Sequence, residues 1–191
     1  MDIETAINLR RTIRRFKQDP ISTEILKKLV DYARVAPVAR NIQALEYIIV
    51  NNTEMNEKLF PLVRWANSLP EDQRTPEKGR EPTAYILVLV NKKIKRAFVD
   101  FDVGAAVENI LLGAISFGIG TCWMAAIDYK RIRELFEIPE DYDLKQVISL
   151  GYSDEESVME PYTDKFAYWK DSEGKMHVPK RSLDEIIFKT Y

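Results

Sequence analysis

The chain has 191 residues, of which 46% are hydrophobic and 30% charged, and its formal net charge is −2. These proportions are typical of a soluble globular protein and exclude a disordered or fibrous chain. The length suits one domain with a sizeable core, so we expect residues 1–191 to form a single domain.

Membrane, secretion and metal-binding signals are not found in the sequence. No apolar run approaches the roughly 20 residues that span a bilayer, and residues 1–4 lack a basic region followed by an apolar stretch. We therefore predict a cytoplasmic protein with no membrane partner. One cysteine, Cys122, excludes an internal disulfide, and one histidine, His177, is too few for a His-based metal site, so no metal is expected.

Helices and strands are predicted to alternate up to residue 151, which is typical of an α/β fold. Apolar side chains recur at helical spacing in residues 2–10 and 22–36. Two apolar runs then predict strands at residues 47–50 and 85–90. Both runs are apolar on both faces, as in central strands that helices cover on each side.

Residues 103–117 predict a helix that is apolar on nearly all sides. Such a helix must be buried, and a second subunit is one candidate to cover it. After it we expect strands at residues 121–127 and 146–151, separated by a helix at residues 129–136.

Two segments interrupt this alternation. Residues 65–82 are rich in proline and charge, and we interpret them as a surface excursion or a lid. Residues 153–179 show little periodicity and are interpreted as a structureless tail, which a compact monomer seldom contains. The tail ends in the apolar residues 182–188, so we expect residues 153–191 to wrap around a partner subunit.

Basic residues cluster at the end of the first predicted helix, at Arg10, Arg11, Arg14 and Arg15, with Thr12 among them. Guanidinium groups match phosphate oxygens in pairs, so the cluster can bind a dianionic phosphate. Taken alone, a solvated basic surface is the commoner reading. A nucleic-acid site is disfavoured because the rest of the chain is acidic and aromatic residues are not interleaved with the arginines.

Three further elements carry chemical information. The amides of Asn41 and Gln43 precede a strand, where they can read the edge of a flavin ring or pin a loop. The glycines of residues 118–120 let a backbone approach a bound ring closely, but the third glycine of a dinucleotide fingerprint is missing. Lys180 and Arg181 add two cations near the end of the chain.

Together these elements closely resemble the nitroreductase family of flavoproteins over about residues 7–187. Residues 10–16 resemble its Arg-Arg-Ser-x-Arg-x-Phe signature, and residues 36–43 resemble its Ala-Pro turn with an asparagine and a glutamine. Residues 104–123 look like its long dimer helix followed by Gly-x-Gly-Thr-x-Trp, and residues 180–183 look like its terminal Arg-Lys-Pro-Leu.

The resemblance implies an α+β nitroreductase-like fold with a mixed four-stranded sheet flanked by helices. It also implies an obligate homodimer in which the C-terminal segment of each subunit adds a fifth strand to its partner, with FMN at the interface. By the same resemblance, the phosphate and ring ligands from one subunit are Arg10, Arg11, Thr12, Arg14, Lys180 and Arg181. The partner contributes Val38, Ala39, Arg40, Asn41 and Gln43, and the opposite side of the flavin meets Trp123, Met124 and Ala125.

The implied activity is an FMN-dependent oxidoreductase that works by a ping-pong mechanism. NAD(P)H reduces the flavin, and a small acceptor such as a nitroaromatic or a quinone then oxidises it. The flavin supplies the chemistry, so no catalytic acid, base or nucleophile is predicted. A flavin carrier without turnover, a dehalogenase-like member and a flavin-processing member of the family remain alternatives.

Overall fold

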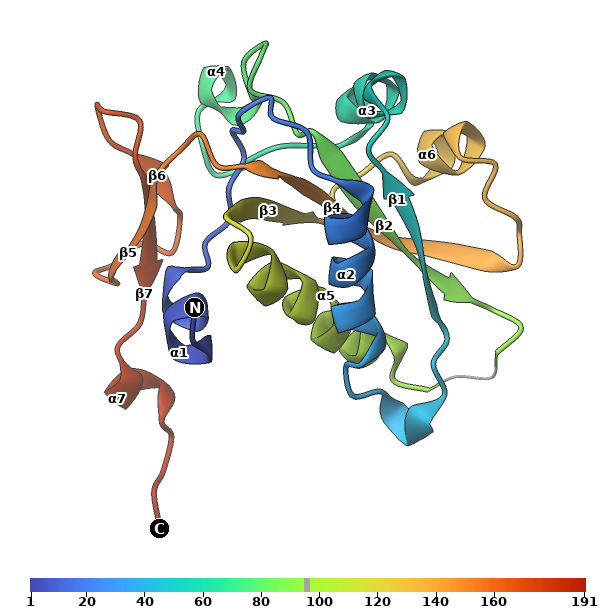
Figure 1. Cartoon of the computed structure of the whole chain (residues 1–191). Coiled ribbons are helices and arrows are strands. Elements are labelled where there is room, and N and C mark those ends of the chain that lie inside the picture. The colour runs from blue at the N-terminus through green and yellow to red at the C-terminus, as the bar shows by residue number, and fades with distance from the viewer. Residues whose placement is uncertain (95–96) are drawn as a thin grey trace.

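The computed structural model describes residues 1–94 and 97–191 (Figure 1). Its centre is a four-stranded sheet in the order β1-β2-β4-β3. These strands are β1 (Leu45–Val50), β2 (Ala84–Asn91), β3 (Ile119–Met124) and β4 (Tyr142–Tyr152). All neighbouring pairs are antiparallel, so the predicted mixed sheet is wrong for the four strands of one chain. β2 is buried on both faces because helices cover both faces of the sheet, and an antiparallel sheet permits this as well as a mixed one does.

Helices cover the two faces of the sheet and create two cores (Figure 1). The first core lies under α2 (Thr23–Arg34) and α5 (Val99–Ile115) and contains alternate residues of β2, such as Ile86. The second lies under α3 (Thr53–Leu59) and α6 (Tyr129–Leu135) and contains the other residues of β2, such as Leu87. The prediction of a central strand buried on both faces is therefore confirmed for residues 85–90 in β2. It is wrong for residues 47–50, because β1 lies at the edge of the sheet and is only partly buried.

The ends of the helices follow from their capping residues. The Asp2 side chain accepts the backbone N–H of Thr5 and begins α1 (Ile3–Leu9), and Ser22 begins α2 in the same way. Helix α3 was not predicted. Its signal is Asn52, whose side chain accepts the N–H of Met55 and thereby caps the helix. The short elements η1 (Ala39–Asn41), η2 (Phe60–Leu62) and α4 (Glu71–Arg74) lie in the connections.

Residues 65–82 begin in the second core and continue at the surface, where residues 70–81 are mostly exposed, as predicted for a surface excursion. Trp65, Ala66 and Leu69 are at least 93% buried and belong to the second core. These apolar residues precede the charged ones and anchor the start of the segment beside the sheet.

Residues 153–179 are also not structureless. They contribute to a small three-stranded sheet in the order β5-β7-β6, formed by β5 (Ser157–Pro161), β6 (Trp169–Lys170) and β7 (Met176–Lys180). Met176 is 1% exposed and joins the second core, so this sheet packs on its own chain. Polar contacts hold the short strands of this sheet together. Its sequence therefore lacks the alternation of apolar and polar residues that would have predicted strands.

The apolar C-terminal end behaves differently from the small sheet. Helix α7 (Leu183–Ile186) and the residues after it extend away from the body of the chain (Figure 1). Leu183, Ile186, Ile187 and Phe188 are all exposed, Phe188 completely. We call residues 182–191 the C-terminal arm. That a partner subunit binds this arm remains a prediction.

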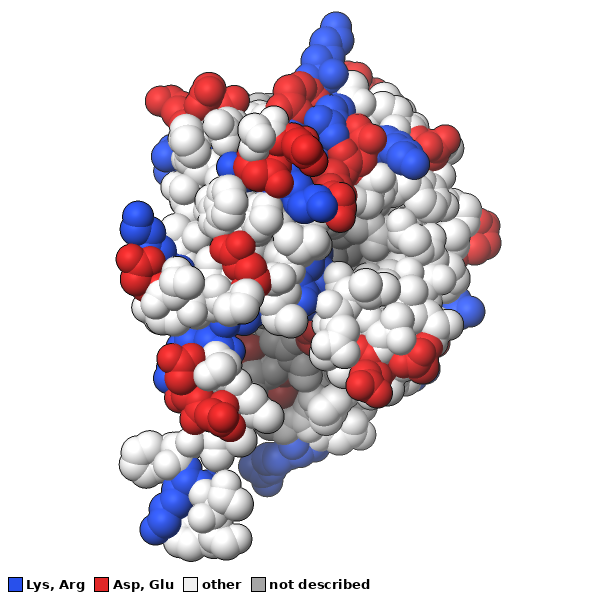
Figure 2. All heavy atoms as spheres, turned by 90° about the vertical axis from the view of Figure 1, so that its left-hand side faces the viewer, with Lys and Arg blue, Asp and Glu red and all other residues white. Residues whose placement is uncertain are grey.

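Two surface properties bear on possible partners. No helix within residues 1–94 and 97–191 has the length and apolar character that crossing a bilayer requires. On the side of the molecule drawn in Figure 2, acidic and basic side chains are interspersed. This face has no continuous basic surface of the kind that follows a nucleic-acid backbone.

His177 on β7 joins all parts of the small sheet. Its Nδ1 lies 3.0 Å from Oε2 of Glu160 on β5, and its Nε2 lies 3.1 Å from Oδ2 of Asp171 after β6. Two carboxylates require both ring nitrogens to donate, which only the imidazolium form does. The hydrogen bond to Asp171 is the main cause that raises the pKa of His177, and the ring stacks on Trp169 at 4.2 Å between centroids.

We expect the stability that His177 contributes to depend on pH. A folded-state pKa above the ordinary 6.5 gives stability that is complete below 6.5 and is lost as the pH rises through the folded value. His177→Gln should therefore lower the melting temperature more at about pH 6 than at about pH 9. Thermal unfolding of both proteins at the two pH values checks this, and an equal loss at both would show that His177 does not act through its charge.

Candidate functional site

The arginine segment that follows α1 runs along the outer edge of β3. Thr12 forms an isolated parallel bridge with Thr121, and the N–H of Ile13 donates to the carbonyl oxygen of Thr121 at 2.9 Å. A Cβ on Gly120 would lie 2.8 Å from Cβ of Ile13. Gly120 thus makes room for this segment, and the expectation that it makes room for a bound ring is wrong. Gly118 has a φ of +70° and turns the chain into β3.

The four arginines of the cluster have different environments. Nε of Arg10 lies 3.1 Å from Oε1 of Glu108 on α5. Arg15 is buried and donates to both carboxylate oxygens of Glu77, from Nε at 2.7 Å and from Nη2 at 2.8 Å. The hydrogen bond from Arg15 lowers the pKa of Glu77 to about 2. Arg10 and Arg15 are therefore already neutralised within the chain, which weakens the reading of this cluster as a nucleic-acid site.

Arg11 and Arg14 have unused hydrogen-bonding capacity. Unlike Nη1 of Arg15, which lies 3.7 Å from Oε2 of Glu155, their unused donors have no ion pair among the described residues. The Nε atoms of both are buried and have no hydrogen-bond partner among the described residues. Burial, and then the neighbouring charge of Arg10, lower the pKa of Arg11. A guanidinium that is desolvated beside another cation is stabilised by an anion, so this pair fits a phosphate group.

The turn at residues 38–43 is strained. Arg40, Asn41 and Gln43 have φ angles of 56°, 55° and 54°, and each left-handed residue costs on the order of 1 kcal/mol. The N–H of Ala39 donates to Oδ1 of Asp102 on α5 at 2.9 Å, which fastens the turn to that helix. Within one chain, the side chain of Gln43 donates to the carbonyl oxygen of Asn41 and so pins the loop. Strain of this kind is typical of ligand-binding turns.

The residues predicted to meet the other side of the flavin differ in their accessibility. Trp123 is 42% exposed, and its Nε1 donates to Oε1 of Gln146 at 3.0 Å. Ala125 is exposed. The side chain of Met124 is 4% exposed and lies in the second core, so only its backbone is available to a ligand.

Lys180 and Arg181 are exposed at the end of β7. A guanidinium nitrogen of Arg181 donates to the carbonyl oxygen of Glu185 in α7. These two cations precede the C-terminal arm and remain predicted phosphate ligands.

One chain does not bring the predicted ligands together. Arg10 contacts α5 at Glu108, whereas Ala39 contacts it at Asp102, which lies fewer than two turns closer to the N-terminus of the helix. In Figure 1 the arginine segment lies beside the C-terminal half of α5, and η1 lies near its other end. The structure thus separates the arginines from the strained turn within the chain.

Comparison with known proteins identifies the chain. The sequence profile of the nitroreductase family matches residues 7–152. The chain belongs to the nitroreductase family. The resemblance noted from the sequence motifs is confirmed, and so is the α+β nature of the fold.

Individual relatives of this nitroreductase-family chain support the same assignment. A protein of Archaeoglobus fulgidus, provisionally named NADH dehydrogenase/NAD(P)H nitroreductase, is 33% identical over 167 residues, which are 84% of this chain and 90% of that protein. Among solved structures, an FMN-dependent nitroreductase of Clostridium difficile is 26% identical with a TM-score of 0.64 and covers 83% of this chain and 91% of its own. A protein of Clostridium acetobutylicum, provisionally named NADH oxidase, is 26% identical with a TM-score of 0.68 and covers 97% and 99%.

Several residues at the site were not predicted. Glu108, Asp102 and Glu155 each hold a member of the predicted site in place, and Tyr168 packs against Arg14. Glu108 and Asp102 carry a signal, because they are two of the three acidic residues of a largely apolar helix. Glu155 and Tyr168 lie far from the arginines in sequence, and nothing local marks them.

Cys122 is confirmed as a buried residue. It is 5% exposed, and burial raises its pKa to about 11. The side chain is therefore a thiol at neutral pH, which is the form unsuited to nucleophilic catalysis.

Proposed function

We propose that the chain is an FMN-dependent oxidoreductase that works as a homodimer. It would take electrons from NADH or NADPH and pass them to a small acceptor, such as a nitroaromatic or a quinone, in two half-reactions. Family membership and the names of the Archaeoglobus fulgidus and Clostridium difficile relatives support this proposal.

The observation that carries the proposal is the pair Arg11 and Arg14. Their Nε donors are buried with no hydrogen-bond partner in the part of the chain that the structure describes, and Arg11 is a desolvated cation beside Arg10. A phosphate monoester would supply two negative charges and several acceptors to these groups. Thr12, Lys180 and Arg181 would complete the set of donors to the phosphate.

Pairing of α5 with its copy would complete the site. One face of α5 is only partly covered by the described residues of its own chain and carries small or apolar side chains, including Gly104, Ala105 and Leu112, with the exposed Phe101 near its start. Exposed apolar residues of α1, Ile3 and Ile7, add to the same region. A two-fold axis across α5 makes the paired helices antiparallel, so the arginines of one chain would meet the turn at residues 38–43 of the other.

The C-terminal arm would strengthen this dimer. β1 is an edge strand whose outer side is unpaired by the described residues of the chain. A groove of about 510 Å³ lies between it and α2, and its apolar lining includes Val30, Ala33, Val38, Leu45 and Tyr47. The exposed apolar side chains of the partner's arm match this groove in chemistry, and its backbone can pair with the free edge of β1.

The residues of the chain would bind and orient, and the cofactor would supply the redox chemistry. FMN, when bound, would supply the transfer of hydride and electrons between a nicotinamide and an acceptor. Arg11 and Arg14 would fix the phosphate, and the strained turn would bring its backbone and amides to the ring. The exposed Trp123 and Ala125 would limit the ring from the other side.

A flavin carrier without turnover is the competing hypothesis, and it would use the same phosphate site. Dehalogenase-like or flavin-processing activity would use it as well. An absorbance spectrum of the pure protein with FMN, recorded before and after addition of NADH or NADPH without oxygen, distinguishes an enzyme that uses nicotinamides from a carrier.

A further inference from the structure

Tyr168, which lies between β5 and β6, packs against the guanidinium of Arg14. Cζ of Arg14 lies 4.6 Å from the centroid of the Tyr168 ring. The phenol oxygen of Tyr168 accepts the N–H of Ser68 at 3.5 Å, and the ring packs on the second core. The ring is therefore held at its far end and along its side, and it offers a fixed surface to the guanidinium.

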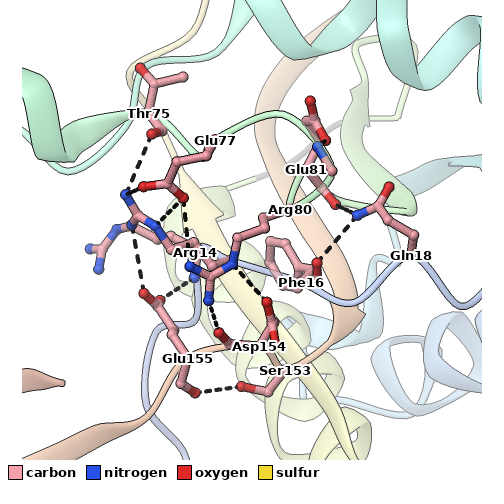
Figure 3. A network of polar contacts seen from close by, with 12 residues as sticks. Arg14, Phe16, Gln18, Thr75, Glu77, Arg80, Glu81, Ser153, Asp154 and Glu155 are labelled. Carbon is pink, nitrogen blue, oxygen red and sulfur yellow. Dashed lines mark hydrogen bonds and ion pairs between the residues drawn. The ribbon is translucent and has the colours of Figure 1, made fainter. Parts of the chain in front are cut away.

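Glu155 holds the backbone of the same arginine (Figure 3). Its side chain is 2% exposed, and Oε1 accepts the N–H of Arg14 at 2.5 Å. The second oxygen, Oε2, lies 3.7 Å from Nη1 of Arg15 and 3.6 Å from Nζ of Lys170. Two cations therefore lie beside this buried carboxylate and help to hold it in place.

The surrounding ion pairs fix Glu155 to the rest of the molecule. Nε of Arg80 lies 2.6 Å from Oδ2 of Asp154, and Arg80 also reaches Glu77, the partner of Arg15 (Figure 3). The arginine segment, residues 73–80 and residues 153–155 thus form one connected network. The network fixes the backbone of Arg14 through Glu155, and the guanidinium of Arg14 lies on the Tyr168 ring.

We propose that Glu155 and Tyr168 are positioning residues for a phosphate group, with Glu155 fixing the backbone of Arg14 and Tyr168 fixing the plane of its guanidinium. A ring beneath the flat face of a guanidinium leaves the donor edges free, and those edges bind phosphate oxygens. An arginine that is already ordered loses less side-chain entropy when it binds. The inference rests on the proposed function, because it concerns the same FMN site.

The ratio of FMN affinity to riboflavin affinity tests this role, because only FMN carries the phosphate. Tyr168→Leu removes the aromatic face and should lower the affinity for FMN by roughly three- to tenfold with little change for riboflavin. Tyr168→Phe keeps the face and loses only the bond from Ser68, so it should retain nearly the wild-type ratio. Fluorescence titrations of both ligands on the dimeric protein give these values.

Glu155 is tested by a second pair of variants. Glu155→Gln keeps an acceptor for the N–H of Arg14, whereas Glu155→Ala removes it. The alanine variant should lower the ratio more than the glutamine variant does. Because a lost buried carboxylate can also unfold the chain, the Tyr168 pair decides the proposal if Glu155→Ala does not fold.

The titrations of the Tyr168 variants and of the wild type can overturn the proposal in different ways. A Tyr168→Leu protein with the wild-type ratio overturns the positioning role, and so does a Tyr168→Phe protein that loses as much as the leucine variant. If the wild-type protein itself binds FMN no better than riboflavin, the phosphate site in the proposed function is wrong, and the positioning role falls with it.

Discussion

Removal of the C-terminal arm, residues 182–191, should abolish dimerisation and flavin binding together. The arm exposes Leu183, Ile186, Ile187 and Phe188, and burial of each such side chain contributes about 1.5–3 kcal/mol. Two arms per dimer therefore account for much of the association energy. The flavin would be lost as well, because its proposed site combines the arginines of one chain with the strained turn of the other, and separated chains cannot form it.

Light scattering and flavin content of the purified proteins measure this coupling. A shorter deletion of residues 189–191 leaves the four apolar side chains in place and should keep both the dimer and the flavin. The small sheet packs on its own chain, so deletion of the arm should leave that sheet folded. A protein without residues 182–191 that remains dimeric with a full complement of FMN would show that the arm does not hold the subunits together.

Arg14→Ala should weaken FMN binding by roughly tenfold or more. Each charge-assisted hydrogen bond to a phosphate is worth about 1.5–3 kcal/mol, and 1.4 kcal/mol corresponds to a factor of about ten in affinity. Riboflavin has no phosphate, so its affinity should change little. Fluorescence titration with both ligands measures the two effects on one protein.

A matched control is available on α6. Arg131→Ala removes the same side chain from an exposed position on the first turn of that helix and should change neither affinity. Equal losses for FMN and riboflavin in Arg14→Ala would indicate a general disturbance of the site. Unchanged FMN affinity would contradict the assignment of Arg14 to the phosphate.

The central fold could be predicted where apolar residues decide the structure. The unbroken apolar run of β2 predicted a strand buried on both faces, and the apolar character of residues 103–117 predicted most of α5. Helix α3 was missed because its evidence was a single cap, Asn52, which was interpreted only as the end of a strand. The small sheet was missed because ionic and aromatic contacts of His177 hold it together.

The candidate site could be predicted only as a set of residues. The sequence identified the arginine cluster but could not show which arginines are paired with carboxylates. The partners of Arg10 and Arg15 lie 98 and 62 positions away, at Glu108 and Glu77. Met124 was expected at the site, but its side chain points into the core, since alternate residues of β3 face opposite sides of the sheet. Tyr168 and Glu155 could not be found from local pattern at all.

The central claim is that the chain binds FMN and that a nicotinamide reduces this bound FMN. The most direct measurement is the absorbance of the pure dimer with one FMN per subunit, followed without oxygen as NADH or NADPH is added. The account predicts that at least one nicotinamide bleaches the flavin absorbance and that a nitroaromatic or a quinone restores it. A flavin that stays oxidised with both nicotinamides would contradict the account and support a carrier.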